Sequence, residues 1–286
     1  MTRWPTLTGC SKQEAPPPRA HPLPCLNASG QLSLPLLWGD PQARQVPLFV
    51  NWEDLAGKGY LPADLRGVSF VQIGANCGKN TYGCAVGGDP VWSYATMCGW
   101  RGVAVEPVSY VFSKLCQNYA RWPLVVPLRG AVADASTWMM MKLGHGESNK
   151  LMHISHSLRP ASDRSKLQNN ETVPVVDLAG LWTQMRPWLS GKVDLLVIDA
   201  EGAEGKILGG GAPLPRPRPS LILFEHVHLP RVQQETIDAK LLREGYKHLQ
   251  DLRNMDPRGA RRRPANRLYG LPTSARGATS WRAKVE

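Results

Sequence analysis

The sequence has no apolar run that approaches the roughly 20 residues a helix needs to cross a bilayer, so no transmembrane segment is predicted. The segment from Met1 to Cys10 lacks the charged and apolar regions of a secretory signal peptide, which leads us to expect a cytoplasmic protein. The six cysteines (10, 25, 77, 84, 98 and 116) form no Cys-x-x-Cys pair and have no histidines at zinc-finger spacing. We therefore expect free thiols and no metal site.

The Gly-x-Gly-x-x-Gly fingerprint of nicotinamide-dependent dehydrogenases is also missing. The nearest feature is Gly74-x-x-x-Gly78, which follows a short apolar run from Val68 to Ile73 rich in β-branched and aromatic residues. Such a run predicts a buried strand, and the glycines predict a turn in which the backbone approaches a ligand closely. A nucleotide-binding α/β unit is therefore favoured over a dehydrogenase.

Both ends of the chain lack apolar periodicity. Residues 1–45 contain eight prolines, and we expect a disordered leader there. From Arg253 to Glu286 there are nine basic and two acidic residues, which account for +7 of the net charge of +11 and leave +4 for the rest. We predict a folded domain over residues 46–250 and a disordered basic tail over residues 251–286.

Acidic residues follow the later predicted strands. Glu106 ends the apolar run from Gly102 to Val105, where a carboxylate can accept hydrogen bonds from both hydroxyls of a ribose. Asp199 and Glu201 follow the run from Val193 to Ile198. Acids at such a place can orient a cationic cofactor, take a proton from a nucleophile or hold a hard metal ion. A further strand, Leu221 to Phe224, is followed by Glu225-His226.

These segments together carry Ile-Gly-Ala-Asn-x-Gly (73–78), Gly-Trp-Arg-Gly-Val-Ala-Val-Glu-Pro (99–107), Ile-Asp-Ala-Glu-Gly (198–202) and Phe-Glu-His (224–226). In this order the set resembles the FkbM family of S-adenosylmethionine-dependent methyltransferases over about residues 68–249. The resemblance implies an α/β protein with a Rossmann-like class I methyltransferase fold, in which helices flank a mostly parallel central sheet. It also implies O-methylation of a hydroxyl on a sugar, glycan or other small-molecule acceptor.

The resemblance also assigns roles to residues. Gly74, Asn76 and Gly78 would line the amino-acid end of S-adenosylmethionine, and Glu106 would hold its ribose. Asp199 and Glu201 would face the sulfonium and the acceptor, with Asp199 positioning the cofactor or acting as the base. His226 is a rival base because its ordinary pKa is near neutrality.

Three features depart from the family pattern. Cys77 stands where the family commonly has Asp, Ala203-Glu204 replaces an aromatic-Asp pair, and the loop from Cys77 to Asp89 is longer. Two alternatives therefore stay open: an inactive family member, and a nucleic-acid binder or RNA methyltransferase that uses the arginine cluster from Arg258 to Arg267. The sequence does not indicate the oligomeric state.

Overall fold

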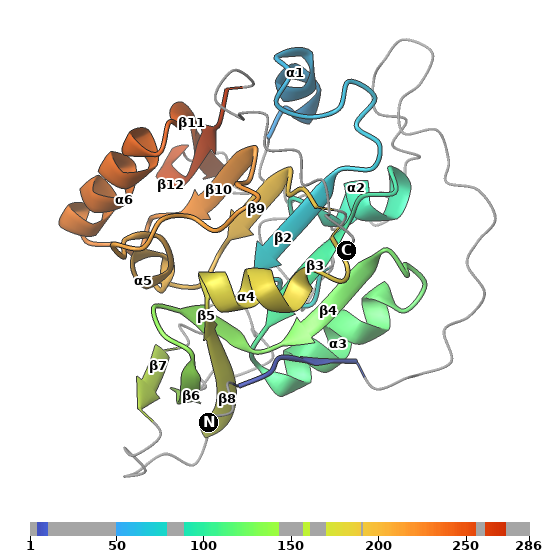
Figure 1. The fold of residues 1–286 in the computed structure, drawn as a ribbon, viewed down its shortest axis with the longest axis vertical. Helices are drawn as coiled ribbons and strands as arrows, with labels where there is room; N and C mark the ends of the chain where they lie inside the picture. The colour runs from blue at the N-terminus through green and yellow to red at the C-terminus, as the bar shows by residue number, and fades with distance from the viewer. Residues whose placement is uncertain are drawn as a thin grey trace, which may run out of the picture.

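The computed structural model describes residues 5–10, 50–78, 89–142, 157–160, 170–189, 191–255 and 261–272. A central eight-stranded sheet organises the molecule (Figure 1). Its strands, in spatial order, are β1 (Thr8–Gly9), β4 (Val125–Arg129), β3 (Arg101–Glu106), β2 (Ser69–Ile73), β9 (Leu195–Ile198), β10 (Leu221–Glu225), β12 (Arg261–Gly270) and β11 (Lys247–Met255). The five strands from β4 to β10 are mutually parallel, as predicted, whereas β1, β12 and β11 pair antiparallel.

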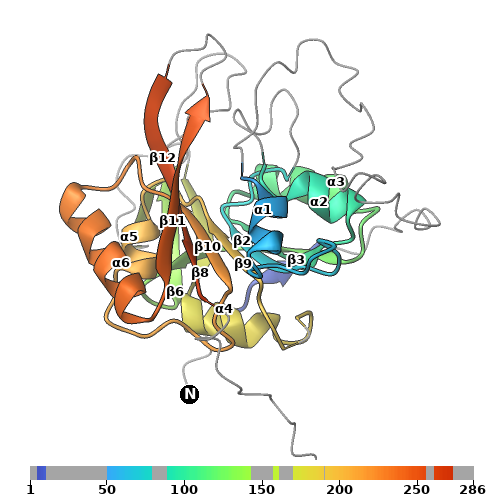
Figure 2. The same cartoon turned by 90° about the horizontal axis from the view of Figure 1, so that it is seen from above.

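Six helices cover the two faces of this sheet in the described part of the chain. They are α1 (Trp52–Gly57), α2 (Trp92–Met97), α3 (Ser109–Tyr119), α4 (Leu178–Met185), α5 (Glu204–Leu208) and α6 (Arg231–Arg243). Because side chains alternate along a strand, Phe70 packs with α1, α2 and α3, whereas Val71 and Ile73 pack with α4, α5 and α6. Figure 2 shows α5 and α6 on the opposite side of the sheet from α1, α2 and α3. The predicted α/β class with helices on both faces is confirmed.

The order of the strands creates a switch point between β2 and β9. From β2 the chain proceeds outward through β3 and β4, and it then returns to form β9 on the other side of β2. In open α/β sheets, ligands bind beyond the carboxyl ends of the strands at such a point. The predicted glycine turn after β2 and the predicted acids after β9 both lie there.

A second, smaller sheet is inserted after β4. It has the order β5 (Ala131–Ala133), β8 (Asn170–Asp177), β6 (Thr137–Lys142) and β7 (Ser157–Pro160). Asp177 ends β8 and its Oδ1 accepts a hydrogen bond from the Gly180 amide at 2.6 Å, which caps α4. In the described part of the chain, no helix is long and apolar enough to cross a membrane.

Two segments that we predicted to be disordered contribute strands to the main sheet. In the leader, β1 pairs with β4 through Thr8 and Gly9. In the tail, β12 lies between β10 and β11, with Leu268 and Tyr269 buried. The disorder prediction is wrong for residues 5–10, 251–255 and 261–272, and the rest of both segments lies outside the described residues. The tail was predicted to be disordered from its composition, because the many arginines of β12 outweigh its short apolar stretch.

We expect β12 to be essential for folding. A chain ending at Met255 should lose cooperative thermal unfolding, because β10 loses a neighbouring strand and the core loses the side chains of Leu268, Tyr269 and Leu271. At about 1.5–3 kcal/mol for each buried side chain, the loss is comparable to the whole stability of a typical domain. The matched control is a chain ending at Pro272, which should melt within a few degrees of the full chain. Equal melting of both truncated chains would contradict the prediction.

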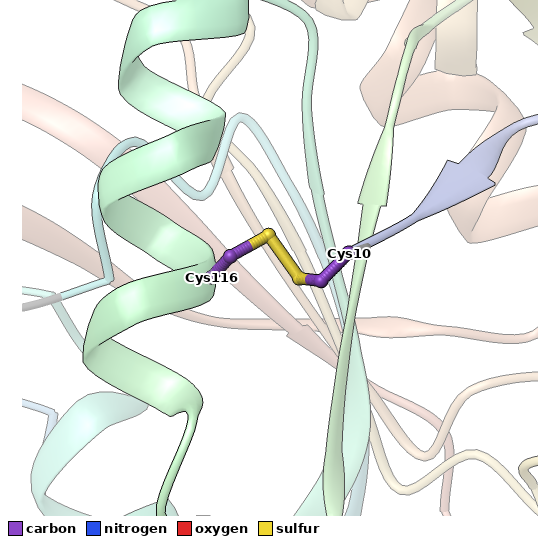
Figure 3. Close-up of a disulfide and its surroundings, with 2 residues drawn as sticks. All are labelled: Cys10 and Cys116. Atoms are coloured by element: carbon purple, nitrogen blue, oxygen red, sulfur yellow. A yellow bond between two sulfur atoms is a disulfide. The ribbon is translucent and has the colours of Figure 1, made fainter. Parts of the chain in front are cut away.

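The expectation of free thiols is also wrong. Cys10, next to β1, forms a disulfide with Cys116 in α3, with a Cα–Cα distance of 5.8 Å (Figure 3). Cys77 and Cys98 are disulfide-bonded as well, and no described cysteine is free. The spacing of cysteines along the sequence does not reveal such pairs. Cys10 and Cys116 are 106 residues apart, and only the pairing of β1 with β4 brings them together.

Candidate active site

The register of the parallel strands places four residues in a row. Val105 of β3 pairs with Ile73 of β2, which pairs with Ile198 of β9, which in turn pairs with Phe224 of β10. The residues that follow these four are Glu106, Gly74, Asp199 and Glu225. One glycine and three carboxylic acids therefore lie side by side at what we call the carboxyl edge of the sheet.

Gly74 is required by the contact between β2 and β9. Its φ is +77°, and a Cβ atom added to it would lie 1.7 Å from the backbone oxygen of Asp199. The Asp199 amide donates to the Ile73 carbonyl at 2.9 Å, which closes the same contact. Asn76 and Gly78 also have positive φ, so the chain turns back tightly after β2. The predicted glycine turn is therefore present, and its backbone contacts the end of β9.

Cys77, which departs from the family pattern, stabilises this loop covalently. Its side chain is buried and disulfide-bonded. Its amide donates to Asn76 Oδ1 at 2.8 Å, and its carbonyl accepts from Asn118 Nδ2 of α3 at 2.8 Å. A disulfide-bonded cysteine thus stands at the position where the family commonly has Asp.

Each carboxylate oxygen of Glu106 accepts a hydrogen bond from a backbone amide. Its Oε2 accepts a hydrogen bond from the Asn76 amide at 3.0 Å, and its Oε1 accepts from the Val108 amide at 2.9 Å. Each carboxylate oxygen can accept further hydrogen bonds, so the group can still hold a diol. Burial raises the pKa of Glu106 to about 7, against the lowering effect of the two amides. The structure brings Glu106 to the cofactor loop, as its predicted role requires.

Asp199 and Glu225 form a hydrogen-bonded carboxyl pair. Burial raises the pKa values of both carboxyl groups, and it is the largest effect. Repulsion from Glu201 and Glu204 raises them further. Asp199 is nevertheless exposed, so solvent moderates the effect of desolvation on its pKa. The pair therefore shares a proton more readily than two isolated acids do.

Glu204 holds the turn after β9. It is buried, and its two carboxylate oxygens accept from the Ala200 amide at 2.5 Å and the Gly202 amide at 2.9 Å. Between these amides lies Glu201, whose φ of +51° is uncommon for a residue other than glycine. Glu204 stabilises this conformation and so sets the direction of the Glu201 side chain. Sequence reasoning treated Glu204 only as a departure from a pattern and missed this role.

The histidine beside the acids is His228 rather than the predicted His226. His226 is buried, and the charged groups that affect its pKa are Arg267, Asp251 and Asp238 rather than the acids of the carboxyl edge. Burial lowers the pKa of His226. His228 instead lies beside two of the acids, with Nε2 at 3.4 Å from Glu201 Oε2 and 3.5 Å from Glu225 Oε2. The sequence pattern does not show which histidine lies beside the acids, because both follow the end of β10.

A doubly wound sheet with a glycine loop at its switch point, acids beyond neighbouring strands and a final antiparallel strand is the Rossmann-like architecture that the resemblance predicted. The family model described as "Methyltransferase FkbM domain" matches residues 72–248. The chain belongs to this family, and its cofactor is S-adenosylmethionine.

Two solved structures resemble the chain at low identity. One is Aeropyrum pernix fibrillarin with natively bound S-adenosyl-L-methionine, at 12% identity and a TM-score of 0.40, covering 71% of this chain and 66% of that one. The other is the Methanococcus jannaschii fibrillarin pre-rRNA processing protein, at 11% identity and a TM-score of 0.39, covering 72% of this chain and 67% of that one. No curated protein sequence matches the chain.

The residues at the carboxyl edge fit S-adenosylmethionine chemically. A ribose diol needs a hydrogen-bond acceptor, which Glu106 offers next to the glycine loop. A positively charged sulfonium needs negative charge or carboxylate oxygens nearby, which Asp199 and Glu225 offer one and two strands away. Both requirements are met within a row of four neighbouring strand ends.

We predict that Glu106 controls the pH dependence of cofactor binding. Because the pKa of Glu106 is raised to about 7, the group is largely protonated at pH 6 and ionised at pH 8. Calorimetry should show tighter S-adenosylmethionine binding at pH 8. Glu106→Gln should weaken binding at pH 8 by about tenfold or more and flatten this dependence, since a hydrogen bond to a charged group contributes about 1.5–3 kcal/mol.

The control for this prediction is Glu235→Gln, which changes an exposed acid paired with Arg231 on α6. It should leave both the affinity and its pH dependence unchanged. In the unliganded protein the raised pKa of Glu106 has the opposite consequence. Its contribution to stability is present below pH 4.5 and is lost as the pH rises toward 7. Binding that tightens equally in the Glu106→Gln variant would show that another group titrates.

Proposed function

We propose that the protein transfers a methyl group from S-adenosylmethionine to a hydroxyl oxygen of a small-molecule acceptor such as a sugar or glycan. The observation that carries this proposal is the carboxyl pair of Asp199 and Glu225 beside the glycine loop. A hydroxyl oxygen must lose its proton when it is methylated, and a positioned carboxylate within reach can accept that proton.

The proposed roles follow the row of strand ends. The loop of Gly74, Asn76 and Gly78 binds the amino-acid end of the cofactor, and Glu106 orients its ribose. When bound, S-adenosylmethionine supplies a methyl group that is already activated by positively charged sulfur. The protein therefore has to align donor and acceptor and to accept a proton. Asp199 accepts that proton, and its hydrogen bond to Glu225 fixes its orientation.

The test is a methyl-transfer assay with purified full-length protein and a panel of sugars, oligosaccharides and hydroxylated natural-product scaffolds. We expect formation of S-adenosylhomocysteine and a mass increase of one methyl group in an acceptor that carries a free hydroxyl. Blocking that hydroxyl should abolish transfer. Methylation at nitrogen or carbon, or cofactor binding without any turnover, would contradict the proposal, and the second result would favour the inactive-member alternative.

No described contact favours the nucleic-acid alternative. Arg267, from the arginine cluster, forms ion pairs with Asp238 of α6 and Asp251 of β11 and is largely buried there. An RNA arm in the assay, read as a salt titration of binding, distinguishes the two classes, because phosphate contacts weaken steeply with salt. Tight, salt-sensitive RNA binding with RNA methylation would overturn the small-molecule proposal.

For the compartment, we propose an oxidising environment in place of the cytoplasm that we expected because Met1 to Cys10 lacks a signal-peptide pattern. The support is that the four described cysteines are all disulfide-bonded. Disulfides persist in oxidising compartments and are rare in the cytosol.

A further inference from the structure

Beyond the proposed cofactor and base, we propose that Glu201, Glu225 and His228 form a binding site for one divalent transition-metal ion. The three side chains come from the turn after β9, the end of β10 and the turn after β10. Each offers one ligand atom, and these atoms all lie within 4.8 Å of one another. Two carboxylates and one imidazole are a ligand set suited to ions such as Mn²⁺ or Zn²⁺.

The distances fit an ion better than they fit direct hydrogen bonds. His228 Nε2 lies 3.4 Å from Glu201 Oε2 and 3.5 Å from Glu225 Oε2. Hydrogen bonds between nitrogen and oxygen are commonly 2.7–3.2 Å long, and a single ring N–H cannot serve both acids well. In contrast, two ligands about 2.1 Å from a tetrahedral ion lie about 3.4 Å apart. The two distances from His228 Nε2 thus match the spacing of ligands around one ion, and the third ligand atom lies within 4.8 Å of the others.

Glu225 provides an independent sign that a partner is missing. Its Oε2, the oxygen nearest His228, is buried and has no hydrogen-bond partner. A buried carboxylate oxygen without a hydrogen bond is costly, and a coordinated cation would satisfy it. In the described part of the chain, His228 is the only basic side chain in ion-pair contact with Glu201 or Glu225. Among the described residues, the cluster therefore offers two carboxyl groups and one imidazole, with no other basic side chain in ion-pair contact with them.

The position of the site gives the ion a role in the reaction. Glu225 is hydrogen-bonded to Asp199, so the ion would lie next to the proposed base. Three protein ligands leave at least one coordination position open, and an acceptor hydroxyl can occupy it. A bound metal would lower the pKa of a coordinated hydroxyl. Its proton would pass to Asp199 while the oxygen forms a bond to the methyl carbon, and the methyl–sulfur bond would break to release S-adenosylhomocysteine. This catalytic role depends on the proposed function, whereas binding of the ion does not.

The test measures ion binding directly on the full chain after treatment with a chelator. We expect saturable binding of one Mn²⁺ per chain, followed by electron paramagnetic resonance, and of one Zn²⁺, followed by calorimetry. His228→Ala should weaken both by at least about tenfold, since loss of an outer-shell partner alone has that effect. Glu201→Gln changes an exposed side chain and should do the same without affecting folding.

The matched control is His248→Ala. His248 is also partly exposed, 43% against 50% for His228, and it also contacts a carboxylate, Asp251 of β11, but it lies outside the cluster. This variant should bind the ions with unchanged affinity. Absence of saturable binding in the wild type, or equal affinity in the His228→Ala and His248→Ala variants, would overturn the site.

Activity measurements separate the site from the proposed function. If the ion binds but no hydroxyl acceptor is ever methylated, the proposed function fails and the metal site stands. If methyl transfer continues at its full rate after a chelator has removed the ion, the catalytic role of the metal is wrong. Loss of transfer in the chelator, with recovery on adding Mn²⁺ or Zn²⁺ to the wild type but not to Glu201→Gln, is the expected result.

Discussion

Asp199→Asn should lower the rate of methyl transfer by about 100-fold or more, because it removes the carboxylate that accepts a proton in the proposed mechanism. The amide has nearly the same shape and can still donate a hydrogen bond to Glu225, so the fold should persist. The loss should appear in kcat, measured as S-adenosylhomocysteine formation at saturating cofactor and acceptor.

Stability measurements distinguish this chemical effect from unfolding. Asp199 lies near Glu201, Glu204 and Glu225, so removing its charge relieves repulsion among like charges. The Asp199→Asn variant should therefore melt at the same temperature as the wild type or at a higher one. His226→Ala is the comparison for the rival base, and it should retain activity in whatever fraction remains folded. Normal turnover in Asp199→Asn together with an inactive, folded His226→Ala variant would reverse the assignment.

Replacing both Cys10 and Cys116 by Ser should lower the stability of the folded protein by several kcal/mol. A disulfide typically contributes about 2–4 kcal/mol, and long closed loops lie toward the upper end in the chain-entropy model. These cysteines are 106 residues apart. For a domain of this size the melting temperature should fall by roughly 5–15 °C. The wild type in a reducing buffer should show at least the same loss.

Chemical labelling checks the pairing itself. Alkylation of the unreduced, denatured protein should leave Cys10, Cys77, Cys98 and Cys116 unmodified. The single Cys10→Ser variant is the control, because it should expose one newly reactive thiol at Cys116. Labelling of Cys10 and Cys116 in the wild type would contradict the disulfide and would restore the expectation of free thiols in a cytoplasmic protein.

Much of the site could be predicted because it lies at the ends of buried strands. Apolar runs such as Leu195–Ile198 predict central strands, and parallel strands bring their carboxyl ends to one edge. Gly74, Glu106 and Asp199 were therefore found from local pattern alone, and the structure brings them to that edge. Asn76 and Gly78 followed from the same turn.

The residues that were missed depend on contacts between segments that are distant in sequence or on the direction of a turn. His228 lies beside Glu201 only because the turns after β9 and β10 face each other, whereas the more conspicuous His226 lies among Arg267, Asp238 and Asp251. The role of Glu204 depends on the amides of a turn whose conformation no periodicity encodes. These are properties of three-dimensional geometry.

By itself, the sequence determined the fold class, the strands that carry the site and the family, because hydrophobic pattern and glycine position act locally. Only the tertiary structure decided the pairing of Cys10 with Cys116, the inclusion of β12 in the sheet and the choice of histidine beside the acids. Each of these three features brings together segments that are distant in sequence, either by strand pairing or by the direction of a side chain. The free energy of such contacts depends on distances in the folded chain, which spacing along the sequence does not express.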